Sequence, residues 1–154
     1  MAEFAIVAGL FFMMIIAIIE FGRLLYTHNA LTDAARRGAR YAVLHQQNAA
    51  CVPNVVVYGE THINATTCAP NAGAKPLITG LIAADVVVAY QGADLDNNPA
   101  TPPTAYGTNL GTATVTIQNY QFTLSIPFVA QTLNMPAYTS TLTAESAGFI
   151  PPDI

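Results

Sequence analysis

Charged side chains are scarce in this sequence of 154 residues. Only 9% of the residues are Asp, Glu, Lys or Arg, against about 25% in a typical soluble domain. Lysine and arginine together number five and the formal net charge is −4, which argues against a nucleic-acid partner because phosphate binding needs a basic patch. Tryptophan is absent, and two cysteines with three histidines exclude a zinc-finger framework, a haem attachment site and a disulfide-dense scaffold.

Recognisable catalytic motifs are also missing. The sequence contains no G-x-S-x-G, no H-E-x-x-H and no glycine-rich phosphate loop, which are the patterns that place nucleophiles, zinc ligands and phosphates. His28, His45 and His62 do not have the spacing of metal ligands. We therefore expect no enzyme, no cofactor and no metal centre formed by the histidines.

The few charges that are present divide the chain into two parts. Four arginines and three acidic residues lie in the first 40 residues, which carry a net charge of +1. The remaining 114 residues hold one lysine and six acidic residues, for a net charge of −5. A composition break of this kind indicates two parts that meet different solvents.

An apolar run of 16 residues begins at Phe4 and ends at Ile19, between Glu3 and Glu20. As a helix it would span about 24 Å, and the slightly longer segment 4–22 would approach the roughly 30 Å of a bilayer core. A signal peptide would need a basic start and a nearby cleavage site, and a soluble helix would show a polar stripe. The run therefore predicts a helix that resides in a membrane.

The helix is expected to continue beyond this run, because no proline precedes Pro53. We predict one helix over about 3–47, with an amphipathic continuation over 23–47, too long to fit inside a domain of this size. Small residues recur every fourth position in the continuation, a pattern that lets helices approach closely but that also suits a helix lying on its own domain. These residues, called the small-residue ladder below, are Ala30, Ala34, Gly38 and Ala42.

Residues 48–154 read as a small β-rich head, so the predicted fold class is α+β. The expected architecture is an antiparallel sheet of four or five strands, with a turn or bulge near Asn119 where the apolar positions change parity. The individual predictions are strands at 54–58, 85–90, 112–118, 122–126 and 138–146, a short helix at 74–83 and an exposed polar loop at 92–111.

Two weak ligand or modification patterns lie in the head. Asp94, Asp96 and Asn98 have the spacing of the first calcium ligands in an EF-hand loop, but Pro99 stands where that loop needs glycine. Solvated turn residues explain them as well. Asn64 begins an N-x-T glycosylation sequence, which occurs by chance in many chains.

Cys51 and Cys68 are the only cysteines and enclose 16 residues. Beyond a membrane, in an oxidising compartment, a lone pair at this separation most often forms a disulfide. The alternative is two free, buried thiols. A bridge requires Cα atoms within about 7 Å, so it predicts that the chain turns back on itself after the long helix.

Three segments of the N-terminal part form a distinctive combination: EFAIV at 3–7, IEFGR at 19–23 and ALTDAARRGARYA at 30–42. Together they resemble the TadE-like family of tight-adherence pilins and pseudopilins. The resemblance covers about the first 45 residues and implies a type IV pilin-like precursor that a prepilin peptidase cleaves at the membrane face. It also implies a long helix that anchors the subunit in the inner membrane and later in the core of a filament.

The resemblance also gives roles to charged residues at the ends of the apolar run. Type IV pilins carry an acid at the fifth mature position, whereas here the acid is Glu3, so two residues are missing before Met1 or the processing differs. The absence of a basic leader ending in glycine fits a mature chain. We expect Glu3 to pair with the N-terminal amine of a neighbouring copy, and Glu20 to pair with Arg23 or with an arginine of another copy, unless both acids only flank the membrane boundaries.

Taken together, these patterns favour a structural pilin that polymerises through its N-terminal helix into an extracellular adhesive filament. The expected partners are other copies, the inner membrane before assembly, the prepilin peptidase and the assembly machinery. A minor pseudopilin or tethered assembly factor of the same system is the first alternative. The second is a membrane-anchored domain whose sheet and 92–111 loop bind a sugar or calcium.

Overall fold

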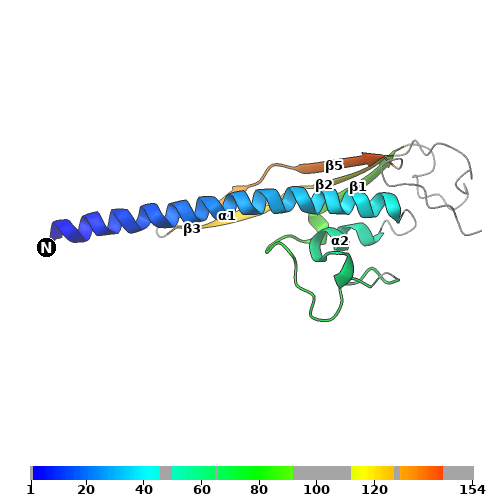
Figure 1. The fold of residues 1–154 in the computed structure, drawn as a ribbon, viewed down its shortest axis with the longest axis horizontal. Coiled ribbons are helices and arrows are strands. Elements are labelled where there is room, and N and C mark those ends of the chain that lie inside the picture. Colours follow the sequence, from blue (N-terminus) through cyan, green and yellow to red (C-terminus); the bar gives the residue numbers. More distant parts are fainter. Residues whose placement is uncertain (1, 46–49, 65, 92–111, 127–128, 144–154) are drawn as a thin grey trace, which may run out of the picture.

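The computed structural model describes residues 2–45, 50–64, 66–91, 112–126 and 129–143. Helix α1 runs from Ala2 to Leu44, close to the predicted range, and is about 64 Å long at 1.5 Å per residue. Figure 1 shows its N-terminal half extending well beyond the rest of the molecule, while the strands and helix α2 lie beside its C-terminal half. The predicted α+β architecture, a long apolar helix followed by small antiparallel sheets, is confirmed.

The core of the head forms where α1, α2 and one sheet meet. The C-terminal half of α1 contributes small side chains, which allow the other two elements to come close. The fully buried positions at this junction are Leu31, Ala34, Ala39 and Ala42 of α1, Val52, Val55 and Val56 of α2, and Ala113, Val115 and Ile117 of strand β2.

Helix α2, Val52–Tyr58, occupies the segment for which we predicted a strand. That prediction was wrong because a short run of valines has no periodicity that separates a buried strand from a buried helix. Pro53 lies in the first turn of α2, where its fixed φ favours a helix and its missing N–H is not needed. Gly59 ends the helix at a φ of 84°, a conformation that glycine adopts without strain.

The strands form two sheets, where we expected one. In the first, the order is β1 (Val86–Gln91), β2 (Thr112–Ile117) and β5 (Tyr138–Thr143), and both pairings are antiparallel. In the second, β3 (Gln121–Ile126) pairs only with β4 (Val129–Asn134). The predicted turn near Asn119 is confirmed, with a φ of 62° at that residue, and it directs β3 out of the first sheet.

The first sheet has a threonine face and an apolar face. Along β2 the residues Ala113, Val115 and Ile117 are buried, while the threonines between them are partly exposed. Cross-strand hydroxyl pairs join Thr114 to Thr141 at 2.9 Å and Thr116 to Thr139 at 3.1 Å. The predicted alternation of both strands is therefore confirmed.

The short helix predicted at 74–83 is wrong. Residues 74–82 contain turns and irregular backbone, and Gly80 has a φ of 89°. One 3-10 turn, η3 (Ala83–Asp85), then leads into β1, and another, η2 (Glu60–His62), follows α2. Pro76 and the glycine interrupt this segment too often for an α-helix to form.

Candidate functional site

The N-terminal half of α1 has no partner within the described part of the subunit. Between Phe4 and Ile19 every residue is exposed except Ala8 and Ile16, which are half-buried. The exposed fraction is 77% for Phe4. The helix is long and apolar enough to cross a membrane, and only 6% of its most apolar 18-residue stretch is buried by the rest of the subunit. This apolar segment is therefore left uncovered by the described part of the subunit and is free for contacts outside it.

Glu20 and Arg23 mark the point where the exposed half of α1 meets the head. Arg23 Nη1 donates to Glu20 Oε1 at 2.7 Å, which confirms the predicted pairing within the subunit. The Glu20 side chain is only 8% exposed, and its Oε2 has no hydrogen-bond partner among the described residues. Arg23 also lies over the Phe122 ring at 4.9 Å and donates through Nη2 to the Thr123 carbonyl oxygen at 3.2 Å.

The sequence did not predict a role for Phe122, whose buried aromatic ring forms this contact with Arg23. Phe122 is 3% exposed and belongs to β3. Figure 1 shows this strand nearer the N-terminal end of α1 than β1 and β2. An arginine that follows an acid by three residues predicts the ion pair. No local pattern predicts which distant aromatic side chain the arginine contacts. The contact between Arg23 and strand β3 therefore could not be predicted from the sequence.

The small-residue ladder packs against the subunit's own head. Ala34 and Ala42 are fully buried, Gly38 is buried and Ala30 is half-buried. A Cβ placed on Gly38 would clash with Val56 Cγ2 of α2 and lie 3.3 Å from Val115 Cγ1 of β2. Of the two interpretations of the ladder, the structure thus shows close approach within the subunit. The head of the subunit thus covers Ala34, Gly38 and Ala42, which are not free for contact with a second copy; an assembly role for the half-buried Ala30 stays a prediction.

Cys51 and Cys68 form the predicted disulfide, with Cα atoms 4.6 Å apart. Asn54 Nδ2 donates to the Cys68 carbonyl oxygen at 2.7 Å, which fixes the same loop to α2. Cys68 itself has a φ of 59°, and its backbone N–H donates to the Asn64 carbonyl oxygen at 2.8 Å. The disulfide ties the loop that follows α2 to the beginning of that helix.

The other two predicted sites are the glycosylation sequence at Asn64 and the calcium candidates of the 92–111 loop. Asn64 is exposed, and its Oδ1 accepts the backbone N–H groups of Thr66 and Thr67 at 2.9 and 3.1 Å, as in a turn. The calcium candidates Asp94, Asp96 and Asn98, and the loop 92–111 that holds them, lie outside the described residues. Within the described ranges, no group of three or more His, Cys, Asp or Glu residues could hold a metal ion.

The three histidines make ordinary polar or aromatic contacts. His28 Nδ1 shares a hydrogen bond with the Tyr138 hydroxyl at 2.8 Å, and His45 stacks on Tyr41 with ring centroids 4.2 Å apart. His62 Nδ1 lies 3.0 Å from the hydroxyl of Thr61. These contacts connect α1 to β5 and pack the end of α1; none of them brings two histidines together.

The arrangement defines a class of protein: an α+β subunit in which one half of a helix is exposed and membrane-capable while the other half belongs to the core of a head. The family model of TadE-like proteins matches residues 1–40, which confirms the resemblance found in the sequence. No curated protein and no solved structure matches the chain. The family match and the apolar helix together fit a membrane protein associated with a tight-adherence pilus.

Proposed function

We propose that this chain is a pilin-like structural subunit. Before assembly, the exposed half of α1 holds it in the inner membrane; afterwards the same segment packs against other copies inside an extracellular adhesive filament. The observation that carries the proposal is the contrast along one helix. Residues 4–19 are almost entirely exposed, whereas Leu31, Ala34 and Ala39 are fully buried by the head.

The energetics of the exposed segment support two successive environments. Burying a large apolar side chain is worth about 1.5–3 kcal/mol, so the exposed segment is strongly unfavourable in water. Lipid removes it from water before assembly, and a bundle of neighbouring helices does so in a filament. The family match covers this same helix, which supports assigning the assembly role to it rather than to the head.

Glu3 is the polar group that would set register in this scheme. It lies in the first turn of α1 and is exposed. A carboxylate next to an apolar segment is costly unless it has a partner. The N-terminal amine of a neighbouring copy would provide the positive charge that pairs with the Glu3 carboxylate. This pair would fix how far one subunit is displaced along the next. Glu20 is not proposed for this role because it already binds Arg23 within the subunit.

The head supports an extracellular location. Disulfides persist in oxidising compartments, and the Cys51–Cys68 bridge fits a head on the outer side of the inner membrane. In this scheme a prepilin peptidase processes the chain at the membrane and the pilus assembly machinery extracts it. The head then covers the filament and provides the adhesive surface.

The proposal is tested on material sheared from the surface of cells that express the chain. Electron microscopy with an antibody to the head should show filaments labelled along their whole length. The Glu3→Ala variant should reach the membrane fraction in normal amounts but give few or no filaments. Filaments in which this chain is only a trace component would instead indicate a minor pseudopilin, and normal filament yield from Glu3→Ala would remove the pairing role of Glu3.

A further inference from the structure

Two of the five basic side chains, both on α1, are exposed and have no polar partner among the described residues. Arg23 binds Glu20, and Arg37 binds Asp33 at 3.1 Å. Arg36 and Arg40 are exposed, and neither makes a hydrogen bond or ion pair with any of the described residues. Two of the five basic residues of this chain therefore lie side by side with no anionic partner among the described residues.

The spacing of these two arginines is unfavourable in the isolated subunit. They are four residues apart on one helix, so their side chains are neighbours, and like charges at this spacing destabilise a helix. Both side chains are exposed, and Arg36 lies at the border where α1 meets the first residues of β5. An anion placed between the two guanidinium groups would turn this repulsion into attraction.

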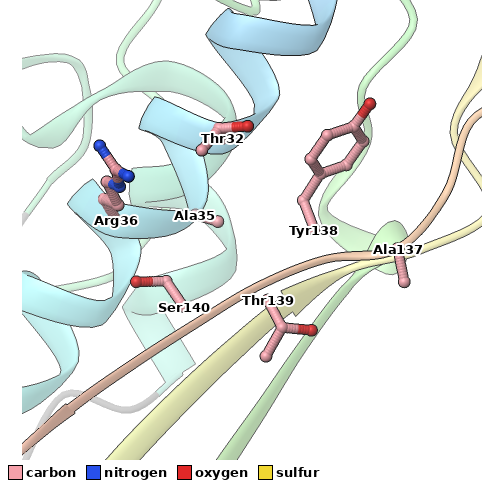
Figure 2. Close-up of a pocket in the computed structure, with 7 residues that line it drawn as sticks. All are labelled: Thr32, Ala35, Arg36, Ala137, Tyr138, Thr139 and Ser140. Carbon is pink, nitrogen blue, oxygen red and sulfur yellow. The ribbon is translucent and has the colours of Figure 1, made fainter.

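A polar cleft lies next to Arg36. It has a volume of about 280 Å³ and is formed by α1 on one side and the first residues of β5 on the other. Figure 2 shows Thr32 and Arg36 along the helix and Tyr138 and Ser140 along the strand. Arg36 is the one charged residue in its lining. The hydroxyl groups of Thr32 and Tyr138 are engaged with His28, and that of Thr139 with Thr116. This leaves the guanidinium of Arg36 and the hydroxyl of Ser140 as the side-chain donors of the cleft. A guanidinium group can donate two parallel hydrogen bonds to a carboxylate, so Arg36 suits an acidic side chain.

The position along α1 decides between two sources of the anion. Arg36 lies 16 residues beyond Glu20, about 24 Å along the helix axis, whereas electrostatic attraction to a charged surface fades over about 10 Å at moderate salt. Lipid headgroups at the end of the apolar segment are therefore too far away. Acidic side chains of other copies are the second source, because residues 41–154 hold six acidic residues and one lysine, and Glu60 among them is exposed.

We propose that Arg36 and Arg40, with the cleft beside Arg36, form the docking surface for an acidic side chain on the head of a second copy. The surface continues the exposed side of α1, so the contact forms when neighbouring helices pack along their apolar halves. It joins unlike surfaces of two subunits, which is the kind of contact that generates an open filament. This inference rests on the proposed polymerisation and identifies a second contact that sets its register.

The experiment compares the lowest concentration at which the purified full chain assembles after detergent removal, at low and at high salt. The double variant Arg36→Gln/Arg40→Gln should raise this concentration about tenfold at low salt and lose most of the salt dependence seen for the wild type. The matched control is Lys75→Glu, which changes the net charge by the same two units at another exposed basic position. It should assemble as the wild type does.

Two further measurements fix the meaning of each outcome. The detergent-solubilised double variant should unfold at the wild-type temperature or slightly above it, because both arginines are exposed and their mutual repulsion is removed. Binding to vesicles that contain anionic lipid should be equal for the two proteins. If the double variant assembles like the wild type, or if it loses only vesicle binding, this inference is overturned alone. If the wild type forms no filaments at any salt concentration, the proposed function is overturned and this inference with it.

Discussion

Arg23 of α1 lies over the ring of Phe122 in β3, with its guanidinium carbon 4.9 Å from the ring centre. The same side chain binds Glu20, the residue that directly follows the exposed segment 4–19. A single arginine therefore joins α1 to strand β3 close to the end of that segment. A cation over a partly desolvated aromatic face contributes about 0.5–2 kcal/mol. The contact lies at the boundary between the exposed segment 4–19 and the part of α1 that packs against the head.

The ion pair at this junction should respond unequally to loss of either partner. Arg23→Met leaves the Glu20 carboxylate 92% buried without its partner, whereas Glu20→Gln leaves a guanidinium that is about half exposed. We expect Arg23→Met to lower the free energy of unfolding by about 1–3 kcal/mol and Glu20→Gln by less than about 1 kcal/mol. Urea unfolding of the detergent-solubilised chain measures both, and equal losses would contradict the burial assigned to Glu20.

Gly38 should tolerate no side chain, because α2 and β2 of the same subunit pack directly against it. Gly38→Ala places a Cβ against Val56 and Val115, and overpacking of this kind costs about 1–3 kcal/mol, more than the 0.5–1 kcal/mol or so that alanine gains over glycine in a helix. Gly22→Ala is the control, because nothing lies within 4 Å of its added Cβ. Thermal unfolding should show a lower midpoint for the first variant and an unchanged or higher one for the second.

The sequence predictions succeeded where the signal is local and failed where a long-range contact decides the structure. The apolar run and its continuation predict α1, and the threonine alternation of β2 and β5 predicts their buried and exposed faces, because these signals are local and extended. The same signals could not place α2, whose five-residue valine segment fits a helix and a strand equally well. They also could not tell that Gly38 meets α2 rather than another copy, since a row of small residues does not identify what approaches it.

The disulfide should contribute to stability through the unfolded chain. The bridge joins residues 17 positions apart, and in the loop-entropy model a closed loop of that size contributes about 3 kcal/mol. Reduction, or the double variant Cys51→Ala/Cys68→Ala, should lower the free energy of unfolding by about that amount. Mass spectrometry of alkylated protein without reductant provides the check on the native state, because two alkylated cysteines would show that no bridge forms.

Alkaline pH should destabilise the head. Burial raises the pKa of Tyr90, Tyr120 and Tyr138 above the ordinary value of 10.0; nearby Tyr41 reinforces the effect at Tyr90, and Arg23 opposes it at Tyr120. The folded state therefore keeps these phenol protons to higher pH than the unfolded chain does. The stability they contribute is complete below pH 10 and is lost as the pH rises through the folded-state pKa values.

The alkaline effect is measured by urea unfolding between about pH 8 and about pH 11, alongside phenolate absorbance. The free energy of unfolding should be constant at the lower end and fall above about pH 10. Tyr120→Phe should show a shallower fall, although it also loses the hydrogen bond from the Tyr120 hydroxyl to the Thr79 carbonyl oxygen. A free energy of unfolding that rises with pH in this range would contradict the burial of the three phenols.

Electron microscopy of the purified chain after detergent removal tests the polymerisation through α1 most directly. It compares the full chain with a chain that begins at Glu20, which lacks the exposed apolar segment but keeps the Glu20–Arg23 pair and the buried half of the helix. The account predicts filaments from the full chain and a folded, soluble monomer from the shortened one. Filaments from both chains, or only amorphous aggregate from the full chain, would contradict it.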